Sequence, residues 1–377
     1  MKNSIFIFSV FLSVSAMLIL PNGYSQTAGE YYKTAVEKAN NYEYDGAIAD
    51  YSKAIELKPE MALAYAGRGY VKFLVLDFNG AIADCDKCIE LDPANKPAYS
   101  TRSLSKFKSG DFEGAKADYT KALKLDPADA DVYFYKGTLE NETGEYSGAI
   151  ADFSMAIKIV PENADAYNSR GLAKKELKDD KGAFADFTKA IAISPGFPLA
   201  YYNRGMLNFF QLDNNSCIED FTKAIETDPN YLDAYYARGH AKKHRGDYAG
   251  AIADFSMMIE IDPATTTGYG DRAEVKYTVK DFAGALEDLN KDIEINPEYG
   301  EAYNNRGLVK LELMDFTGAI ADFSKTIEFN PEHDEAYYNR GIAKIESGSK
   351  EGGYLDLKRS SELGYTKATK AVQKFCK

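Results

Sequence analysis

His240 and His244 are the residues whose type and spacing most directly suggest chemistry. They lie four residues apart, which places both imidazoles on one face of a helix, a spacing that a metal ion can use. Glu274 follows His240 by 34 residues and could supply a third ligand. The sequence holds only three histidines, and a solvated pair is the plainer interpretation. We therefore predict no metal and no cofactor, and keep a metal or small-ligand site at His240 and His244 as the alternative.

The cysteines also invite a chemical interpretation, because Cys85 and Cys88 form a Cys-x-x-Cys pair. A redox-active pair needs an exposed thiol at a helix N-terminus. Both cysteines instead lie within a predicted helix on its apolar face, and Cys217 occupies a position that is usually Ala in the rest of the chain. We interpret all three as small core residues.

Signatures of an enzyme are not found in the sequence. The segment 268–273, GYGDRA, resembles a dinucleotide-binding loop only in its letters, because it follows no predicted strand. The many acidic residues recur at a fixed interval, and no pair of carboxylates stands apart from that pattern as a catalytic pair would. We predict that the protein is not an enzyme.

The elements that position these residues come from a repeat of 34 residues. Nine prolines mark it, at positions 59, 93, 127, 161, 195, 229, 263, 297 and 331. A period of this length is the signature of a repeat protein. Ten repeats fit residues 28–367, and they begin at Ala28, Ala62, Lys96, Ala130, Ala164, Pro198, Leu232, Thr266, Gly300 and Asp334. Positions within a repeat are counted below from these first residues.

Each repeat contains the pattern of two helices. In the second half of the repeat that begins at Gly300, Ala319, Ile320, Phe323 and Ile327 share one helical face. The proline ends that helix, since it has no amide hydrogen and disfavours a helical residue before it. The first half has its own helical spacing of apolar residues. In several repeats it ends at a Gly followed by an acidic residue, where the glycine ends the first helix and the acidic residue begins the second.

Residues of this repeat match a known family. Tyr303, Gly307, Ala319, Phe323 and Pro331 stand at positions 4, 8, 20, 24 and 32, and this pattern resembles the tetratricopeptide repeat. The resemblance covers nearly all of the chain after Thr27. It implies an all-α fold, a right-handed α-solenoid of antiparallel helix pairs whose first helices line a concave groove. We find no linker, so we expect one domain, with residues 365–377 as a C-terminal capping helix.

The repeat departs from the family in carrying opposite charges at positions 7 and 23. Position 7 is basic from the second repeat on: Arg68, Arg102, Lys136, Arg170, Arg204, Arg238, Arg272, Arg306 and Arg340. Position 23 is always Asp: Asp50, Asp84, Asp118, Asp152, Asp186, Asp220, Asp254, Asp288, Asp322 and Asp356. We predict a ladder in which each Arg is flanked by two Asp, of the same and the preceding repeat. The alternative is a charged, solvated outer face.

The same resemblance implies which residues bind a partner. In this family, position 6 is often an Asn that bonds the backbone of a bound peptide, and here it is Asn203, Asn305 or Asn339 in three repeats. Aromatic residues surround these amides, which suits a protein or peptide partner. The lysine-rich clamp of chaperone adaptors is not visible. The predicted binding residues are Tyr202, Asn203, Met206, Phe209, Phe210, Tyr236, His240, Asn304, Asn305, Tyr338 and Asn339.

The N-terminal sequence and the net charge indicate where the protein is located and which partners are disfavoured. Residues 1–25 have one charge, Lys2, and an apolar run before small residues, which is typical of a secretory signal peptide. An uncleaved membrane anchor is the alternative. We expect an exported protein, periplasmic or secreted, with no membrane insertion after removal of the signal. The formal net charge of −13 disfavours nucleic acid as a partner.

Overall fold

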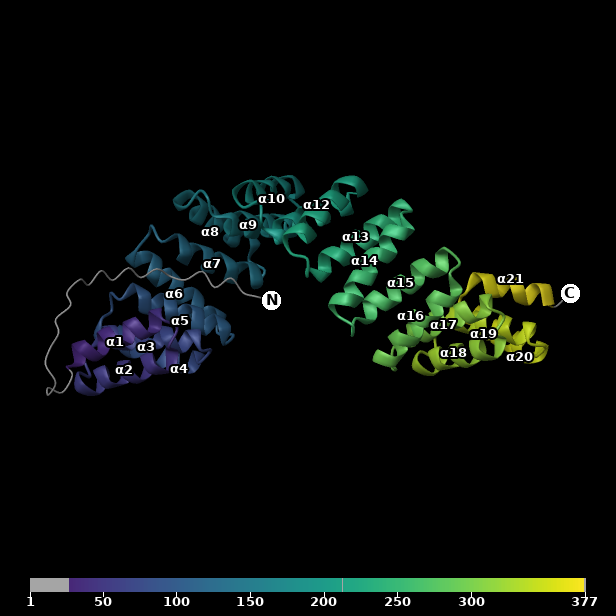
Figure 1. Cartoon of the computed structure of the whole chain (residues 1–377), viewed down its shortest axis with the longest axis horizontal. Coiled ribbons are helices and arrows are strands. Elements are labelled where there is room, and N and C mark those ends of the chain that lie inside the picture. The colour runs from purple at the N-terminus through teal and green to yellow at the C-terminus, as the bar shows by residue number, and fades with distance from the viewer. Residues whose placement is uncertain (1–26, 212, 376–377) are drawn as a thin grey trace. The chain divides into compact units, whose positions relative to one another are not determined.

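The structure is a computed structural model that describes residues 27–211 and 213–375. These residues form helices and no strand, and in nine of the ten repeats the two helices pack against each other as an antiparallel pair (Figure 1). The predicted signal peptide and Cys376 lie outside the described residues. The first helices of the repeats are α1 (Ala28–Asn40), α3 (Ala62–Leu74), α5 (Lys96–Lys108), α7 (Ala130–Glu142), α9 (Ala164–Glu176), α11 (Pro198–Phe210), α13 (Leu232–Arg245), α15 (Thr266–Thr278), α17 (Gly300–Glu312) and α19 (Asp334–Glu346).

The second helices follow at a constant offset. They are α2 (Tyr44–Leu57), α4 (Phe78–Leu91), α6 (Phe112–Leu125), α8 (Tyr146–Ile159), α10 (Asp180–Ile193), α12 (Asn214–Thr227), α14 (Tyr248–Ile261), α16 (Phe282–Ile295), α18 (Phe316–Phe329) and α20 (Lys350–Glu362). A last helix, α21 (Thr366–Phe375), packs against α20. Every first helix begins at the residue predicted as the start of its repeat, which confirms the all-α solenoid of helix pairs.

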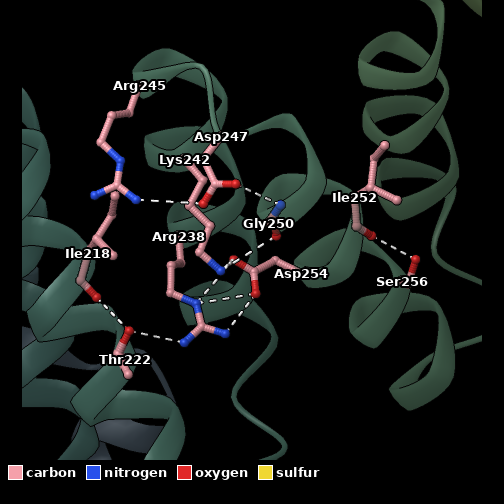
Figure 2. Close-up of polar contacts among 10 residues, drawn as sticks. All are labelled: Ile218, Thr222, Arg238, Lys242, Arg245, Asp247, Gly250, Ile252, Asp254 and Ser256. Carbon is pink, nitrogen blue, oxygen red and sulfur yellow. Dashed lines mark hydrogen bonds and ion pairs between the residues drawn. The ribbon is translucent and has the colours of Figure 1, made fainter. Parts of the chain in front are cut away.

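The turn between the two helices of a repeat is built from one residue in the left-handed region and one acidic cap. Gly246 adopts φ +84° at the end of α13, a conformation that glycine enters without a steric penalty. Asp247 then caps α14, because its Oδ1 accepts a hydrogen bond of 3.0 Å from the amide of Gly250 (Figure 2). The glycine and acidic residue therefore stop one helix and start the next, as predicted.

The core of each repeat depends on a close approach between positions 8 and 24. A Cβ atom added at Gly307 would lie 2.7 Å from Cε1 of Phe323, which is fully buried. The eighth repeat has Ala273 and Leu289 at these positions, a larger residue opposite a smaller one, and both are buried. A larger side chain on the first helix is thus offset by a smaller one on the second, as close packing requires.

The charged ladder exists, but its second partner is not the one predicted. In the seventh repeat, Arg238 binds Asp254 of its own repeat through Nε and Nη2, with Nη2 2.7 Å from Oδ1 (Figure 2). Its Nη1 donates to the hydroxyl of Thr222, at position 25 of the preceding repeat, over 3.0 Å. Each Arg thus has one Asp partner at position 23, and Asp50, expected beside Arg68, pairs with Lys38 instead.

This ladder contact recurs with little change along both parts of the chain. The arginines that pair with Asp of the same repeat and bond residue 25 of the preceding one are Arg68, Arg102, Arg170, Arg204, Arg238, Arg272, Arg306 and Arg340. A lysine at position 11 usually binds the second carboxylate oxygen, as Lys242 does at 2.8 Å from Asp254. The Arg–Asp–Lys group therefore joins the two helices in seven repeats, and the contact to residue 25 joins each of these repeats to the preceding one.

The described helices form two compact units. The first ends at Thr143 and contains α1–α7, and the second begins at Gly144 and contains α8–α21. The division falls inside the fourth repeat, where position 7 is Lys136 and pairs with Glu140 of the same helix at 2.8 Å. Among the described residues, none of the helices has the length and apolar character needed to span a membrane.

Candidate partner-binding face

The candidate site lies on the first helices of the second unit. Within this unit, first helices of neighbouring repeats contact each other directly, as α11 does α13 and α17 does α19. Side chains at positions 5, 6, 9, 12 and 13 of adjacent first helices can therefore meet. We call the surface that these positions form in α9–α19 the first-helix face.

The predicted residues of the sixth repeat are used largely for packing. Tyr202 is half-buried, with its ring centroid 5.8 Å from that of Phe221 and 5.2 Å from that of Tyr231. Met206 and Phe209 pack against the buried cluster that includes Phe221. The following residue of this helix behaves differently, because Phe210 is 65% exposed and has the Nζ of Lys175 6.0 Å from its ring centroid.

The two histidines of the seventh repeat do not assemble the metal site kept as the alternative. His240 lies against Tyr236, with ring centroids 4.5 Å apart, and its Nε2 is 3.1 Å from Oδ2 of Asp271. His244 is exposed and packs on an aromatic ring, while Glu274 pairs with Lys243 at 2.7 Å. In the described ranges, no group of three His, Cys, Asp or Glu side chains is placed to hold a metal ion.

The buried asparagine side chains at positions 5 and 6 either bond each other between repeats or keep an unsatisfied polar atom. Asn203 is buried, and its Nδ2 donates a hydrogen bond of 2.9 Å to Oδ1 of Asn168, at position 5 of the preceding repeat. Asn304 and Asn339 stand in the same relation in repeats nine and ten, and they are 5% and 7% exposed. Yet Oδ1 of Asn304 and Nδ2 of Asn339 have no hydrogen-bond partner in the described structure. Both atoms are buried, so this acceptor and this donor are unsatisfied polar groups within the first-helix face.

Two other predicted residues lie beside the open amides. Asn305 is exposed at position 6 of α17. Tyr338 is half-buried at position 5 of α19, with its ring centroid 5.1 Å from that of Tyr365. The first-helix face of repeats nine and ten thus combines an exposed amide, two open amide atoms and an aromatic ring.

Sequence reasoning missed Asp292, a residue of α16 whose carboxylate lies beside Gly270 of the first-helix face. It stands at position 27, which is Ala in five repeats, and it is only 2% exposed. Burial raises the pKa of its carboxyl group to about 6, and its Oδ1 has no hydrogen-bond partner within the described part of the chain. The signal was present, since a charged residue replaces Ala on the apolar side of a helix.

The cysteines confirm the structural interpretation. Cys85, Cys88 and Cys217 are buried, and none of them forms a disulfide within the described residues. Burial raises the pKa of the Cys88 thiol to about 11, so it stays protonated at neutral pH. A protonated, buried thiol is a poor nucleophile, and no redox role follows from the Cys-x-x-Cys spacing.

Comparison with known proteins agrees with this architecture. Models described as tetratricopeptide repeat match residues 101–164, 164–197, 199–231 and 221–253, and a model described as TPR repeat matches residues 43–74. No curated protein matches.

Solved structures that resemble the chain share its fold. One is PilF of Pseudomonas aeruginosa, with a TM-score of 0.50, 17% identity, and coverage of 58% of this chain and 97% of that one. Another is a tetratricopeptide repeat protein of Parabacteroides merdae, with a TM-score of 0.46, 21% identity, and coverage of 66% and 98%. With its helix pairs, its 34-residue period and the matches to models of the family, the chain belongs to the tetratricopeptide repeat proteins.

Proposed function

We propose that this protein is a non-enzymatic scaffold that binds an extended segment of a partner protein across the first-helix face of repeats nine and ten. The observation that carries the proposal is the open pair of amide atoms, Oδ1 of Asn304 and Nδ2 of Asn339. The equivalent pair in repeats five and six, Asn168 and Asn203, is closed by its own hydrogen bond.

The chemistry of the open pair matches a peptide group. Each peptide group offers one N–H donor and one carbonyl acceptor, and Asn304 can accept while Asn339 can donate. A buried polar atom without a partner is unfavourable by about 1–3 kcal/mol, and a ligand that supplies the partner removes that penalty. Tyr338 and the exposed Asn305 adjoin the pair, and aromatic grooves of this kind suit extended peptides.

Selection of peptides on the whole chain tests the proposal. Phage displaying random peptides are selected on wild-type protein and on the double variant Asn304→Ala, Asn339→Ala. The matched control is Asn168→Ala, Asn203→Ala, which removes the same atoms where they are closed on each other. We expect enriched peptides to bind wild type and control alike and to lose roughly 30-fold in affinity for the double variant, since each of the two lost hydrogen bonds contributes about 1 kcal/mol. Equal loss in both variants, or no enrichment, would refute the proposal.

We also propose that the protein is exported, to the periplasm or outside the cell. The support is the sequence of residues 1–25, with one charge and an apolar run before Pro21. Mass spectrometry of the chain expressed with these residues should find an N-terminus close to Gln26. A chain that keeps Met1 and stays with the membrane fraction would indicate an anchor instead.

A further inference from the structure

The first-helix face is interrupted at Gly270, on α15. Position 5 carries Tyr202, Tyr236, Asn304 and Tyr338 in the neighbouring repeats, whereas the eighth repeat has glycine. A Cβ atom added at Gly270 would meet one heavy atom within 4 Å beyond its own helix backbone, Oδ2 of Asp292 at 3.4 Å. The carboxylate of Asp292 therefore faces the position that the glycine leaves without a side chain.

Asp292 is the unusual group at this place. In the next two repeats, position 27 donates a hydrogen bond to the carbonyl of the first residue of its own repeat: Thr326 to Gly300 over 3.1 Å and Ser360 to Asp334 over 2.7 Å. An ionised carboxylate cannot donate in this way. Its Oδ1 accordingly remains buried without a partner.

Further negative charge surrounds the same place. Burial and then the charges of Glu301, Asp292 and Asp271 raise the pKa of Tyr299, and burial and then Asp271 raise that of Tyr236. His240 also borders this place, because its Nε2 lies 3.1 Å from Oδ2 of Asp271. The rings of Tyr299 and Tyr236 are 47% and 40% exposed. The site thus joins a buried carboxylate, a second carboxylate and two accessible aromatic rings.

We propose that the acidic site formed by Asp292 and Asp271 beside Gly270 receives a lysine or arginine side chain of the bound partner segment. A cation supplies the donor that Asp292 lacks and compensates its buried charge. The tyrosine rings can flank the aliphatic stem and attract the charge. The inference rests on the proposed function, because it assumes that a peptide lies on this face.

The arrangement also sets where the basic residue falls. Helix α15 contacts α17, which carries Asn304. Packed helices are about 8–10 Å apart, and an extended peptide advances about 3.3 Å per residue. The basic side chain should therefore stand about three residues from the peptide group held at Asn304.

The test compares peptides selected on the wild-type chain with the same peptides carrying norleucine in place of the selected Lys. We expect wild-type protein to bind the Lys form roughly tenfold more tightly, as for a hydrogen bond to a charged group. Asp292→Ala should bind both forms equally and keep the affinity of the norleucine form. It restores the residue of five other repeats, so the fold is expected to persist, and circular dichroism checks this.

The control Glu287→Ala removes one charge from an exposed position of α16 and should keep the Lys preference. If Asp292→Ala retains the preference while peptides still bind, the acidic site is wrong and the proposed function stands. If peptides bind but none carries a basic residue at a fixed position, the inference is likewise refuted. If the wild type selects no peptide, the inference and the proposed function fall together.

Discussion

Replacing Asp292 by Ala should stabilise the free protein at neutral pH. The carboxyl group is 2% exposed and its pKa is raised by burial from 3.8 to about 6. Each unit of difference between folded and unfolded states corresponds to about 1.4 kcal/mol, so the ionised side chain lowers the free energy of unfolding by up to about 3 kcal/mol. Alanine at this position is fully buried in five other repeats, Ala54, Ala122, Ala156, Ala190 and Ala224, and needs no charge compensation.

The pH dependence of the free energy of unfolding distinguishes removal of the buried charge from improved packing by alanine. Below about pH 4 the group is protonated in both states, and its ionisation contributes nothing. As pH rises from about 4 to 6, the unfolded chain loses the proton while the folded chain keeps it, so the wild type loses stability. Above about pH 6 the loss is complete. The difference between variant and wild type should therefore grow across that window and then stay constant.

Urea unfolding followed by circular dichroism measures this difference at several pH values. Glu287→Ala serves as the control, because it removes an exposed carboxylate of the same helix and should leave the free energy of unfolding nearly unchanged. A gain that is the same at every pH would show that packing, not ionisation, is responsible. A variant less stable than the wild type at neutral pH would refute the account of Asp292 as a buried, uncompensated charge.

Three other substitutions test the packing and the ladder by thermal or urea unfolding. Gly307→Ala should destabilise the chain by about 1–3 kcal/mol, because the added methyl group overpacks the contact with Phe323. The double variant Gly307→Ala, Phe323→Leu, which carries the residues of repeat eight, should recover most of that stability. If it does not, side-chain volumes at positions 8 and 24 do not compensate each other. Asp254→Ala should destabilise by about 3–5 kcal/mol because it leaves the ladder cations uncompensated, whereas exposed Glu226→Ala should change stability by under about 1 kcal/mol. Gly270→Ala should stabilise by about 0.5–1 kcal/mol, since Ala suits a helix better and its Cβ has room.

Most of the fold follows from the sequence because the repeat is enforced by local chemistry. Proline and the Gly–acidic turn set helix ends residue by residue, and the spacing of small and aromatic residues sets the packed face. The proline and the small and aromatic residues recur in nearly every repeat, which is why the first helices begin where predicted. In the turns between the two helices, glycine before an acidic residue occurs only at Gly110, Gly144 and Gly246, and other residues adopt the left-handed conformation in several of the remaining turns. The division at Thr143 has no counterpart in the sequence pattern, because the 34-residue repeat continues across it.

The ladder shows where sequence spacing is insufficient. Asp50 and Arg68 lie at equal distances from Pro59, which suggests that they face each other at one level. Residues two apart on a helix point in directions about 200° apart. Asp84 at position 23 therefore faces the first helix of its own repeat, and Ser52 at position 25 faces the next one, where it bonds Arg68. One side chain cannot face both helices.

The candidate site was only partly predictable for a related reason. The positions of Asn304 and Asn339 follow from the repeat, but whether an amide is closed or open depends on its neighbour one repeat away. Asn203 closes on Asn168, whereas the later pair does not close. A sequence pattern gives the identity of each amide and not the geometry between two helices, so the open pair needed the structure.

The ladder also explains how the first-helix face can vary while the fold stays constant. Its contacts occupy positions 7, 11, 23 and 25, which lie between helices and fix their spacing. Positions 5, 6 and 9 of the first helix are left out of this framework and differ freely from repeat to repeat. Where position 5 is reduced to glycine, at Gly270, the buried carboxylate of Asp292 lies behind the first-helix face. A change at two positions thus forms the acidic site proposed above without disturbing the ladder, because Arg272 and Asp288 of the same repeat remain paired at 2.6 Å.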